Sequence, residues 1–382
     1  MKVQIYIQNI LFLLLAIYFA QGSLYETGSV ISQFVLLLVF AISITYLIKS
    51  LFSRDNKNIF YTAWTLLLGL NIVGFVFTAD YSLHFGMFKG ILITMLPFYP
   101  FYYFAQNGTL KSKHLIYFFL LILPIIISQF YANRYKILLE SNMDDENVVN
   151  NIAYSFVSLI PYVFLIKRSK IISFAAILLV IYFVILGSKR GAMIVGAVGL
   201  LFYIYYQLFA VERKKRLRAF VLGFIGLSVI GYYGYGVFES NEFFMERMES
   251  IKEGNSSGRD IIYMNIFNGW YESENFFNVL FGYGFAGSTK LSGSGHLAHN
   301  DWLEVLSNFG LVGFFVYLFL FFAAYRCIRN PLLPKDKKIL MATISAMFFV
   351  TSLFSMGYTN ESTYLITIIW AFAVDTRNQK LN

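Results

Sequence analysis

The chain has 382 residues, of which 58% are hydrophobic, 19% aromatic and only 13% charged. A soluble globular domain carries about 25% charged residues, so this composition excludes an ordinary soluble enzyme. The single cysteine, Cys327, excludes an intramolecular disulfide and any cysteine-based metal cluster. The composition therefore predicts an all-α polytopic membrane protein.

Apolar runs near or above the roughly 18–20 residues needed to cross a bilayer recur along the whole sequence, and they predict about twelve transmembrane helices. The expected spans are 4–21, 28–49, 58–78, 83–105, 114–131, 150–166, 170–187, 190–210, 219–238, 299–325, 338–356 and 362–375. The first run lacks a small-residue cleavage site, which favours a retained helix over a removed signal peptide.

The net charge of +9 would be compatible with a nucleic-acid partner, but the placement of the basic residues indicates another origin. With the N-terminus in the cytoplasm, most of the 30 lysines and arginines fall in cytoplasmic loops and tails. This asymmetry is the positive-inside pattern of membrane proteins. We therefore expect cytoplasmic N- and C-termini and basic residues that anchor the protein at lipid headgroups, and we expect no nucleic-acid partner.

The pattern divides the chain into three parts, which are helices 1–9 over residues 1–238, a large periplasmic or extracellular loop over 239–298, and helices 10–12 with a cytoplasmic tail over 299–382. Within the loop, the spacing of apolar residues predicts an amphipathic helix over 239–253. Residues 260–280 predict a second helix, broken near Gly269, and the Gly/Ser-rich stretch 282–297 predicts no regular element.

Prolines and glycines mark special positions in several of the expected spans. Pro97 and Pro100 are expected to break the fourth span, because each removes a backbone donor. Gly310 and Gly313 in the tenth span are expected to let a neighbouring helix approach closely.

Lys189 and Arg190 stand in the shortest outer loop, on the face where the topology should exclude positive charge. Arg190 begins the eighth span, and a helix N-terminus already favours an anion. Small neighbours such as Gly191 leave the guanidinium room to meet a ligand. The pair predicts a phosphate site. The alternative is that the charged side chain only extends to the membrane–water interface and binds no ligand.

Arg259 follows the short polar sequence SSG and precedes an apolar helix. A guanidinium forks onto phosphate better than any other side chain does. The alternative is a salt bridge within the loop, for example with Asp260.

His299 lies where the long loop becomes the tenth span. A neutral imidazole can accept a proton from a hydroxyl near pH 7. Asp301 and Glu304 fit a D-x-x-E capping box that would begin a helix just after His299. The alternatives are a surface histidine or part of a metal site, because His296 and His299 form a weak H-x-x-H pattern.

Lys89 is the clearest charged residue in the middle of an expected span, and an intramembrane lysine is by default a functional candidate. The alternative is that its side chain extends toward the outer interface. His84 lies one turn above Lys89, on the side of that interface.

Taken in order, these motifs resemble the O-antigen ligase and O-antigen polymerase superfamily. The motifs are Arg190-Gly191, the stretch from Arg247 to Arg259 (RMESIKEGNSSGR), Gly282-Tyr283-Gly284-Phe285, and His299-Asn300 through Gly310 and Gly313. The resemblance covers residues 187–320 as motif and most of the chain as topology.

The resemblance implies a membrane glycosyltransferase of the C-type fold that lies in the bacterial inner (cytoplasmic) membrane and has its active site on the outer face. It implies an undecaprenyl-pyrophosphate-linked glycan as donor, and neither a metal, a nucleotide sugar nor another cofactor. By this analogy His299 would be the general base, and Arg190 and Arg259 would hold the leaving pyrophosphate. The further substrate-binding candidates are Lys189, Arg247, His296, Asn300 and Lys89.

The acceptor divides the superfamily. A polymerase transfers the glycan to another lipid-linked repeat unit, and a ligase transfers it to lipid A core. We favour a polymerase of O-antigen, capsule or exopolysaccharide, for which a chain-length regulator is a further candidate partner. A lipid-linked glycan flippase stays open as an alternative of another class, although it predicts more buried charges in the spans. The outer-loop aromatics are expected to stack on sugars or to cover the helices; they are Trp270, Tyr271, Phe276, Phe277, Tyr283 and Phe285.

Overall fold

The computed structural model describes residues 2–52, 57–78, 80–141, 148–209 and 258–376, together with the single positions 221 and 228. The expected ninth span, the expected amphipathic helix over 239–253 and Arg247 lie outside the described residues.

Within the described residues, six helices are long and apolar enough to cross a membrane. They are α2 (Val30–Phe52), α3 (Ile59–Val76), α6 (Ser112–Ser141), α9 (Arg190–Phe209), α15 (Asp301–Arg329) and α16 (Lys335–Phe354). Shorter apolar helices are α1 (Lys2–Phe19), α7 (Ala153–Val163), α8 (Lys170–Leu186), and the 3-10 turn η3 (Glu361–Thr363) followed by α17 (Tyr364–Ala373). The described part of the chain is all-helical and consistent with a polytopic membrane protein, and the count of about twelve spans stays a prediction.

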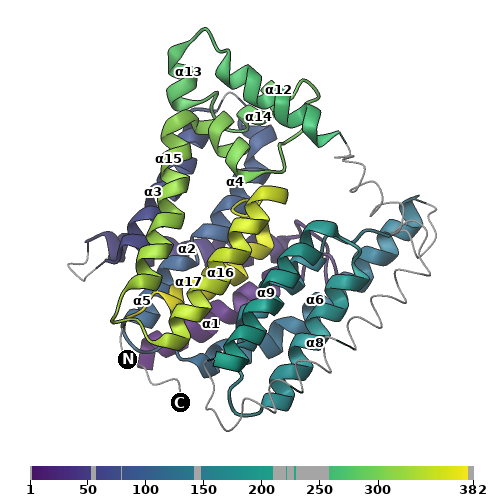
Figure 1. The fold of residues 1–382 in the computed structure, drawn as a ribbon, viewed down its shortest axis with the longest axis vertical. Helices are drawn as coiled ribbons and strands as arrows, with labels where there is room; N and C mark the ends of the chain where they lie inside the picture. The colour runs from purple at the N-terminus through teal and green to yellow at the C-terminus, as the bar shows by residue number, and fades with distance from the viewer. Residues whose placement is uncertain are drawn as a thin grey trace.

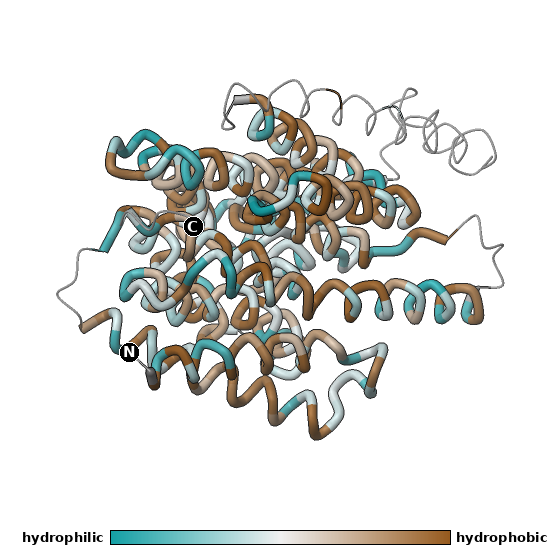
Figure 2. Tube along the Cα trace, turned by 90° about the horizontal axis from the view of Figure 1, so that it is seen from below, coloured by the Kyte–Doolittle hydropathy of each residue, from teal (hydrophilic) through white to brown (hydrophobic). Residues whose placement is uncertain are grey.

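The helices pack around an aromatic core, and apolar residues dominate along their length (Figure 2). Trp64 of α3 and Trp370 of α17 are fully buried, with ring centroids 5.4 Å apart. Many other large apolar side chains, such as Phe52 and Leu201, are exposed. Such an exposed surface is costly in water, and it is the surface that a lipid bilayer covers.

The fourth expected span is two helices, α4 (Tyr81–Met95) and α5 (Phe98–Gln106), as the prolines indicated. Pro97 stands at the break and precedes the first residue of α5. Pro100 lies inside the first turn of α5, where N–H groups have no partner within the helix, so it is tolerated there. The break is therefore confirmed at Pro97, and the expected break at Pro100 is wrong.

Helices α12 (Arg259–Tyr271), α13 (Phe276–Phe281) and α14 (Gly287–Leu291) lie together at one end of the bundle, beyond the start of α15 (Figure 1). The expected helix after residue 260 is confirmed, but its break falls at residues 272–275. Gly269 stays helical and lets Leu291 of α14 pack closely, because a Cβ there would lie 3.1 Å from Leu291 Cδ2. The expectation of no regular element over 282–297 is wrong at α14.

Helix α15 is broken at Gly310, whose backbone has φ 60° and ψ −153°. The preceding turn therefore offers carbonyl groups to another segment. Tyr283 and Gly284 donate their N–H groups to the carbonyls of Ser307 and Asn308, at 2.8 and 3.1 Å. The Gly282–Phe285 motif thus fastens the α13–α14 connection to the break in α15.

Close approach explains one of the two glycines in this span. A Cβ on Gly310 would lie 2.4 Å from the carbonyl carbon of Leu280, so the expected close approach of a neighbouring segment is confirmed. Gly313 differs, because its nearest neighbours are Phe309 Cβ and Val305 O of its own helix. The expectation is wrong there, because the break folds the preceding turn back onto it.

Candidate active site

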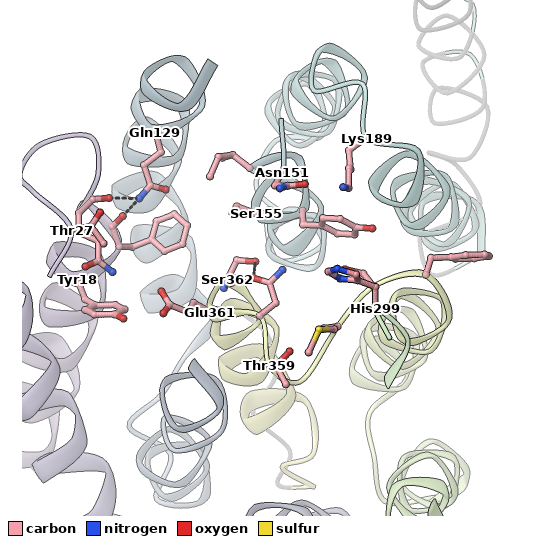
Figure 3. A pocket seen from close by; sticks show the side chains of 18 of the residues that line it. Tyr18, Thr27, Gln129, Asn151, Ser155, Lys189, His299, Thr359, Glu361 and Ser362 are labelled. Carbon is pink, nitrogen blue, oxygen red and sulfur yellow. Dashed lines mark hydrogen bonds between the residues drawn. The ribbon is translucent and has the colours of Figure 1, made fainter. Parts of the chain in front are cut away.

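A cavity of about 670 Å³ opens among the ends of several helices, within the range of about 300–1,000 Å³ that is usual for ligand sites. Its lining comes from the end of α1, from α6, from the start of α7, and from the segment 354–362. Lys189, Arg259 and His299 complete it, each from a different part of the chain. Figure 3 shows Lys189 and His299 near each other in the cavity wall.

The cavity brings together only part of the predicted site. Lys189, Arg259 and His299 line it, although 110 residues of sequence separate the first from the last. Arg190 begins α9 next to Lys189 but does not line the cavity. Three further predicted residues, His296, Asn300 and Lys89, lie outside the lining.

Lys189 is presented by a tight turn between α8 and α9. Gly187 ends α8, and Ser188 adopts a left-handed backbone with φ 49°. Gly187 accepts a hydrogen bond from Asn150 N at 2.9 Å, and a Cβ on Gly187 would lie 2.8 Å from Ala153 Cβ. The turn is therefore fixed against the start of α7, which holds Lys189 at the cavity.

Arg259 is the first residue of α12, directly after Gly258 with φ 78°. Its Nη1 donates to the carbonyl of Phe354 at 3.1 Å, which ties α12 to the end of α16. A guanidinium has five N–H donors, so this contact is compatible with binding an anion in the cavity.

His299 has a left-handed backbone with φ 51°, which is uncommon for a residue with a side chain. Its two neighbours hold this conformation. Glu304 accepts a hydrogen bond from Ala298 N at 2.5 Å, and Asn300 caps α15 by accepting from Trp302 N and Leu303 N. A strained backbone held from both sides is a feature that clusters at functional sites.

The predicted Asp301–Glu304 capping box is wrong, because Asn300 occupies the cap position one residue earlier. Glu304 instead accepts from Ser288 Oγ at 2.7 Å as well as from Ala298. Asp301 accepts from Gly357 N at 2.9 Å and from Tyr317 Oη at 2.7 Å. Both buried carboxylates therefore hold segments that build the cavity.

The surroundings of His299 favour its neutral form. Loss of solvent lowers the pKa of its imidazole below the ordinary value of 6.5, and the positive charges of Arg259, Lys189 and His296 lower that pKa further. A neutral imidazole has one ring nitrogen that can accept a proton. The ring therefore stands in a cationic environment in the state that a general base requires.

The sequence reasoning missed the other half of the cavity. Glu361, Asn360 and the residues around them line it beside Tyr18 of α1 and Gln129 of α6. Lys89 of α4 interacts electrostatically with the Glu361 carboxylate, which gives this lysine a partner. One sequence signal could have indicated this half of the cavity. Glu361 is an ionisable residue at the start of an apolar run, and such a residue is a functional candidate.

The other histidines serve elsewhere. His84 Nδ1 is 2.6 Å from Thr78 Oγ1 in a buried pair, and His114 Nδ1 accepts from Lys111 N at 3.2 Å. In the part of the chain that the structure describes, no group of three His, Cys, Asp or Glu side chains could hold a metal ion. Independence from metal stays a prediction.

The aromatic residues of the outer loop divide between two roles. Trp270 is buried and its Nε1 donates to Val279 O at 3.2 Å, and Phe285 packs on Phe75 of α3. Phe276 and Phe277 are exposed. Among the residues described, none of these loop aromatics lines the cavity, and only the buried rings, such as those of Trp270 and Phe285, pack over the helices.

Comparison with known protein families gives a match. Residues 174–318 match the protein family described as O-antigen ligase. The matched segment runs from α8 through α12–α14 into α15, and it contains Lys189, Arg259 and His299. No curated protein matches the chain.

Proposed function

We propose that the chain acts as a member of the O-antigen polymerase and ligase superfamily and transfers a glycan from undecaprenyl pyrophosphate to a sugar hydroxyl, and the family match over residues 174–318 supports this proposal. The acceptor in this proposal is a second lipid-linked repeat unit, so the product is a surface polysaccharide. The observation that carries the proposal is the presence of Lys189, Arg259 and His299 in one cavity.

In this mechanism the neutral imidazole of His299 accepts the proton of the acceptor hydroxyl. The hydroxyl oxygen then attacks the anomeric carbon, and the bond from that carbon to the pyrophosphate oxygen breaks. Lys189 and Arg259 stabilise the negative charge that develops on the leaving pyrophosphate. A single displacement inverts the anomeric configuration.

The remaining predicted residues take supporting roles in the proposal. Arg190 stabilises the same pyrophosphate from the start of α9, and Arg247 and His296 bind substrate from the outer loop. Both polar atoms of the Asn300 side chain are engaged, since Oδ1 caps α15 and Nδ2 donates to Leu353 O at 3.1 Å. We therefore assign Asn300 to the positioning of His299.

The proposal includes a place in the cell envelope. About twelve helices of the C-type glycosyltransferase fold cross the bacterial inner membrane, with both termini in the cytoplasm and residues 239–298 on the outer side. Figure 1 is compatible with this topology, because the chain begins at the end of the bundle away from α12–α14. The cavity would then face the outer leaflet, where the flipped lipid donor is presented.

A reconstituted assay tests the function. Purified protein in liposomes receives lipid-linked repeat units alone, or the same units with lipid A core, and the products are separated on a gel. A ladder from repeat units alone supports the polymerase. Transfer to the core without a ladder would assign a ligase, the activity in the description of the matching family.

The His299→Ala variant separates chemistry from transport. Loss of a general base lowers turnover by about 10²–10⁴-fold, whereas a flippase without chemistry should keep moving its lipid. His114→Ala is the matched control, because His114 lies at the start of α6 and does not line the cavity. Full glycan assembly by His299→Ala would refute the proposed mechanism.

A further inference from the structure

The cavity has two chemically different ends. Figure 3 shows Lys189 and His299 together on one side and Tyr18, Thr27 and Gln129 on the other, with Glu361 toward the second group. The first end carries the positive charge that suits a pyrophosphate. The second end has no role in the proton transfer or in stabilising the leaving group, so it needs a separate explanation.

The second end is rich in hydrogen-bonding groups. Tyr18 offers a phenol hydroxyl, Gln129 and Asn360 offer amide groups, and Glu361 offers a carboxylate. A ligand with several hydroxyls could use all of these groups at once, because each hydroxyl both donates and accepts.

Part of this end is fixed before any ligand arrives. Gln129 Nε2 donates to the carbonyls of Phe19 and Gln21, which orients the amide, and the Gln21 side chain accepts from Ser32 Oγ at 2.5 Å. Asn360 Oδ1 accepts from Ser362 N at 3.0 Å. These contacts preorganise the groups, which reduces the entropy cost of binding.

Two polar atoms at this end remain without a hydrogen bond of good geometry among the described residues. They are the hydroxyl of Tyr18, a side chain only 1% exposed, and Oε1 of Gln129. Buried polar atoms are nearly always satisfied, because leaving one unsatisfied costs about 1–3 kcal/mol. Their position in the wall of a cavity points to a partner that enters it.

We propose that Tyr18, Gln129 and Glu361 form a subsite for an uncharged sugar residue, next to the reacting bond. The inference rests on the proposed glycan transfer and adds the class of sugar to it. The Glu361 carboxylate accepts hydrogen bonds from hydroxyls of a neutral sugar and repels the carboxylate of an acidic sugar. Burial of Glu361 disfavours its ionised form, and the positive charge of Lys89 partly offsets this effect.

Binding is measured directly, without turnover. Saturation-transfer NMR on the purified chain in detergent uses a neutral oligosaccharide free of lipid and pyrophosphate, and its uronic-acid counterpart. We expect the neutral sugar to bind and the acidic one to bind at least tenfold more weakly. Equal binding of both sugars would overturn the proposal.

Two variants locate the subsite. Tyr18→Phe removes one hydroxyl and should weaken binding of the neutral sugar about three- to tenfold, with little change in the thermal midpoint because that hydroxyl makes no hydrogen bond of good geometry among the described residues. Glu361→Gln should weaken binding more than tenfold and reduce the discrimination against the acidic sugar. Glu272→Gln, on an exposed residue at the end of α12, is the matched control and should bind normally. Normal sugar binding by both Tyr18→Phe and Glu361→Gln would also overturn the proposal.

Kinetics with a soluble acceptor glycoside then identify the source of the sugar. A raised KM for the acceptor in Glu361→Gln assigns the subsite to the acceptor, and a raised KM for the lipid donor assigns it to the donor.

Failure of the sugar subsite and failure of the proposed glycan transfer give different results. His299→Ala should lose turnover and keep sugar binding, and a wild-type chain that binds sugar through Tyr18 but transfers nothing would refute only the proposed function.

Discussion

Replacing Gly282 with alanine tests how the outer-loop helices are fastened to α15. Gly282 ends α13 with φ 75° and ψ −169°, a conformation that is nearly exclusive to glycine. A Cβ there would lie 2.4 Å from both Asn308 C and Phe309 N. These are backbone atoms, so the overlap cannot be relieved by the rotation of a side chain.

The magnitude follows from two separable terms. The backbone conformation costs an alanine about 1–3 kcal/mol, and forcing extra volume into a packed contact costs about 1–3 kcal/mol more. Gly284 supplies a matched control, because its φ is 85° but nothing lies within 4 Å of a Cβ placed on it. Gly284→Ala should therefore show the first term alone.

The assay is the thermal midpoint of the purified variants in detergent, followed by intrinsic fluorescence. For larger soluble domains about 1 kcal/mol moves the midpoint by roughly 2–4 °C, so Gly282→Ala should melt several degrees below Gly284→Ala. Equal midpoints for the two variants would refute the close approach of α13 to α15. A wild-type midpoint for both would also refute the backbone strain.

Four further predictions concern the site. Arg259→Lys should reduce kcat/KM by at least tenfold because a lysine cannot fork onto a phosphate, and near-normal turnover would indicate a structural role. His299 accepts a proton only when neutral, so activity should fall as pH drops through its lowered pKa; Lys189→Met removes one cause of that lowering and should move the acid limb of the pH–rate profile to higher pH. The two carboxylate oxygens of Glu304 accept hydrogen bonds from Ala298 N and Ser288 Oγ, and Glu304→Gln replaces one of these oxygens with an amide nitrogen that cannot accept. The backbone before His299 is then held less firmly, so kcat should fall about 10–100-fold while the donor KM stays constant. Turnover should survive a strong chelator, and loss that one specific metal restores would contradict a metal-free mechanism.

Much of the helical architecture could be predicted because its signals are local. The apolar run 58–78 appears as α3 at Ile59–Val76, and the run 338–356 as α16 at Lys335–Phe354. Pro97 marks a break for a purely covalent reason, since it has no N–H to donate. The same local reasoning failed at Asp301, because Asn300 competes for the cap position and a tertiary contact with Gly357 recruits the carboxylate.

The site could be predicted only where polar, ionisable residues interrupt an otherwise apolar sequence. Arg259 and His299 stand out in an apolar sequence, but nothing local indicates that Tyr18 or Gln129 will share their cavity. Tyr18 reads as one more residue of an apolar helix, and its hydroxyl becomes informative only when the segment around Glu361 is placed beside it. Long-range proximity of this kind depends on the packing of helices distant in sequence.

The composition of the cavity wall has a consequence for the synthesis of the protein. Its lining includes Tyr18, from the first helix, and Glu361, from the segment that precedes the last described helix. A membrane chain is synthesised and inserted from its N-terminus, so the cavity stays incomplete until the segment around Glu361 has left the ribosome. A shorter nascent chain thus presents the cationic residues without their closing wall, and competence for a lipid-linked substrate arises only when that segment is in place.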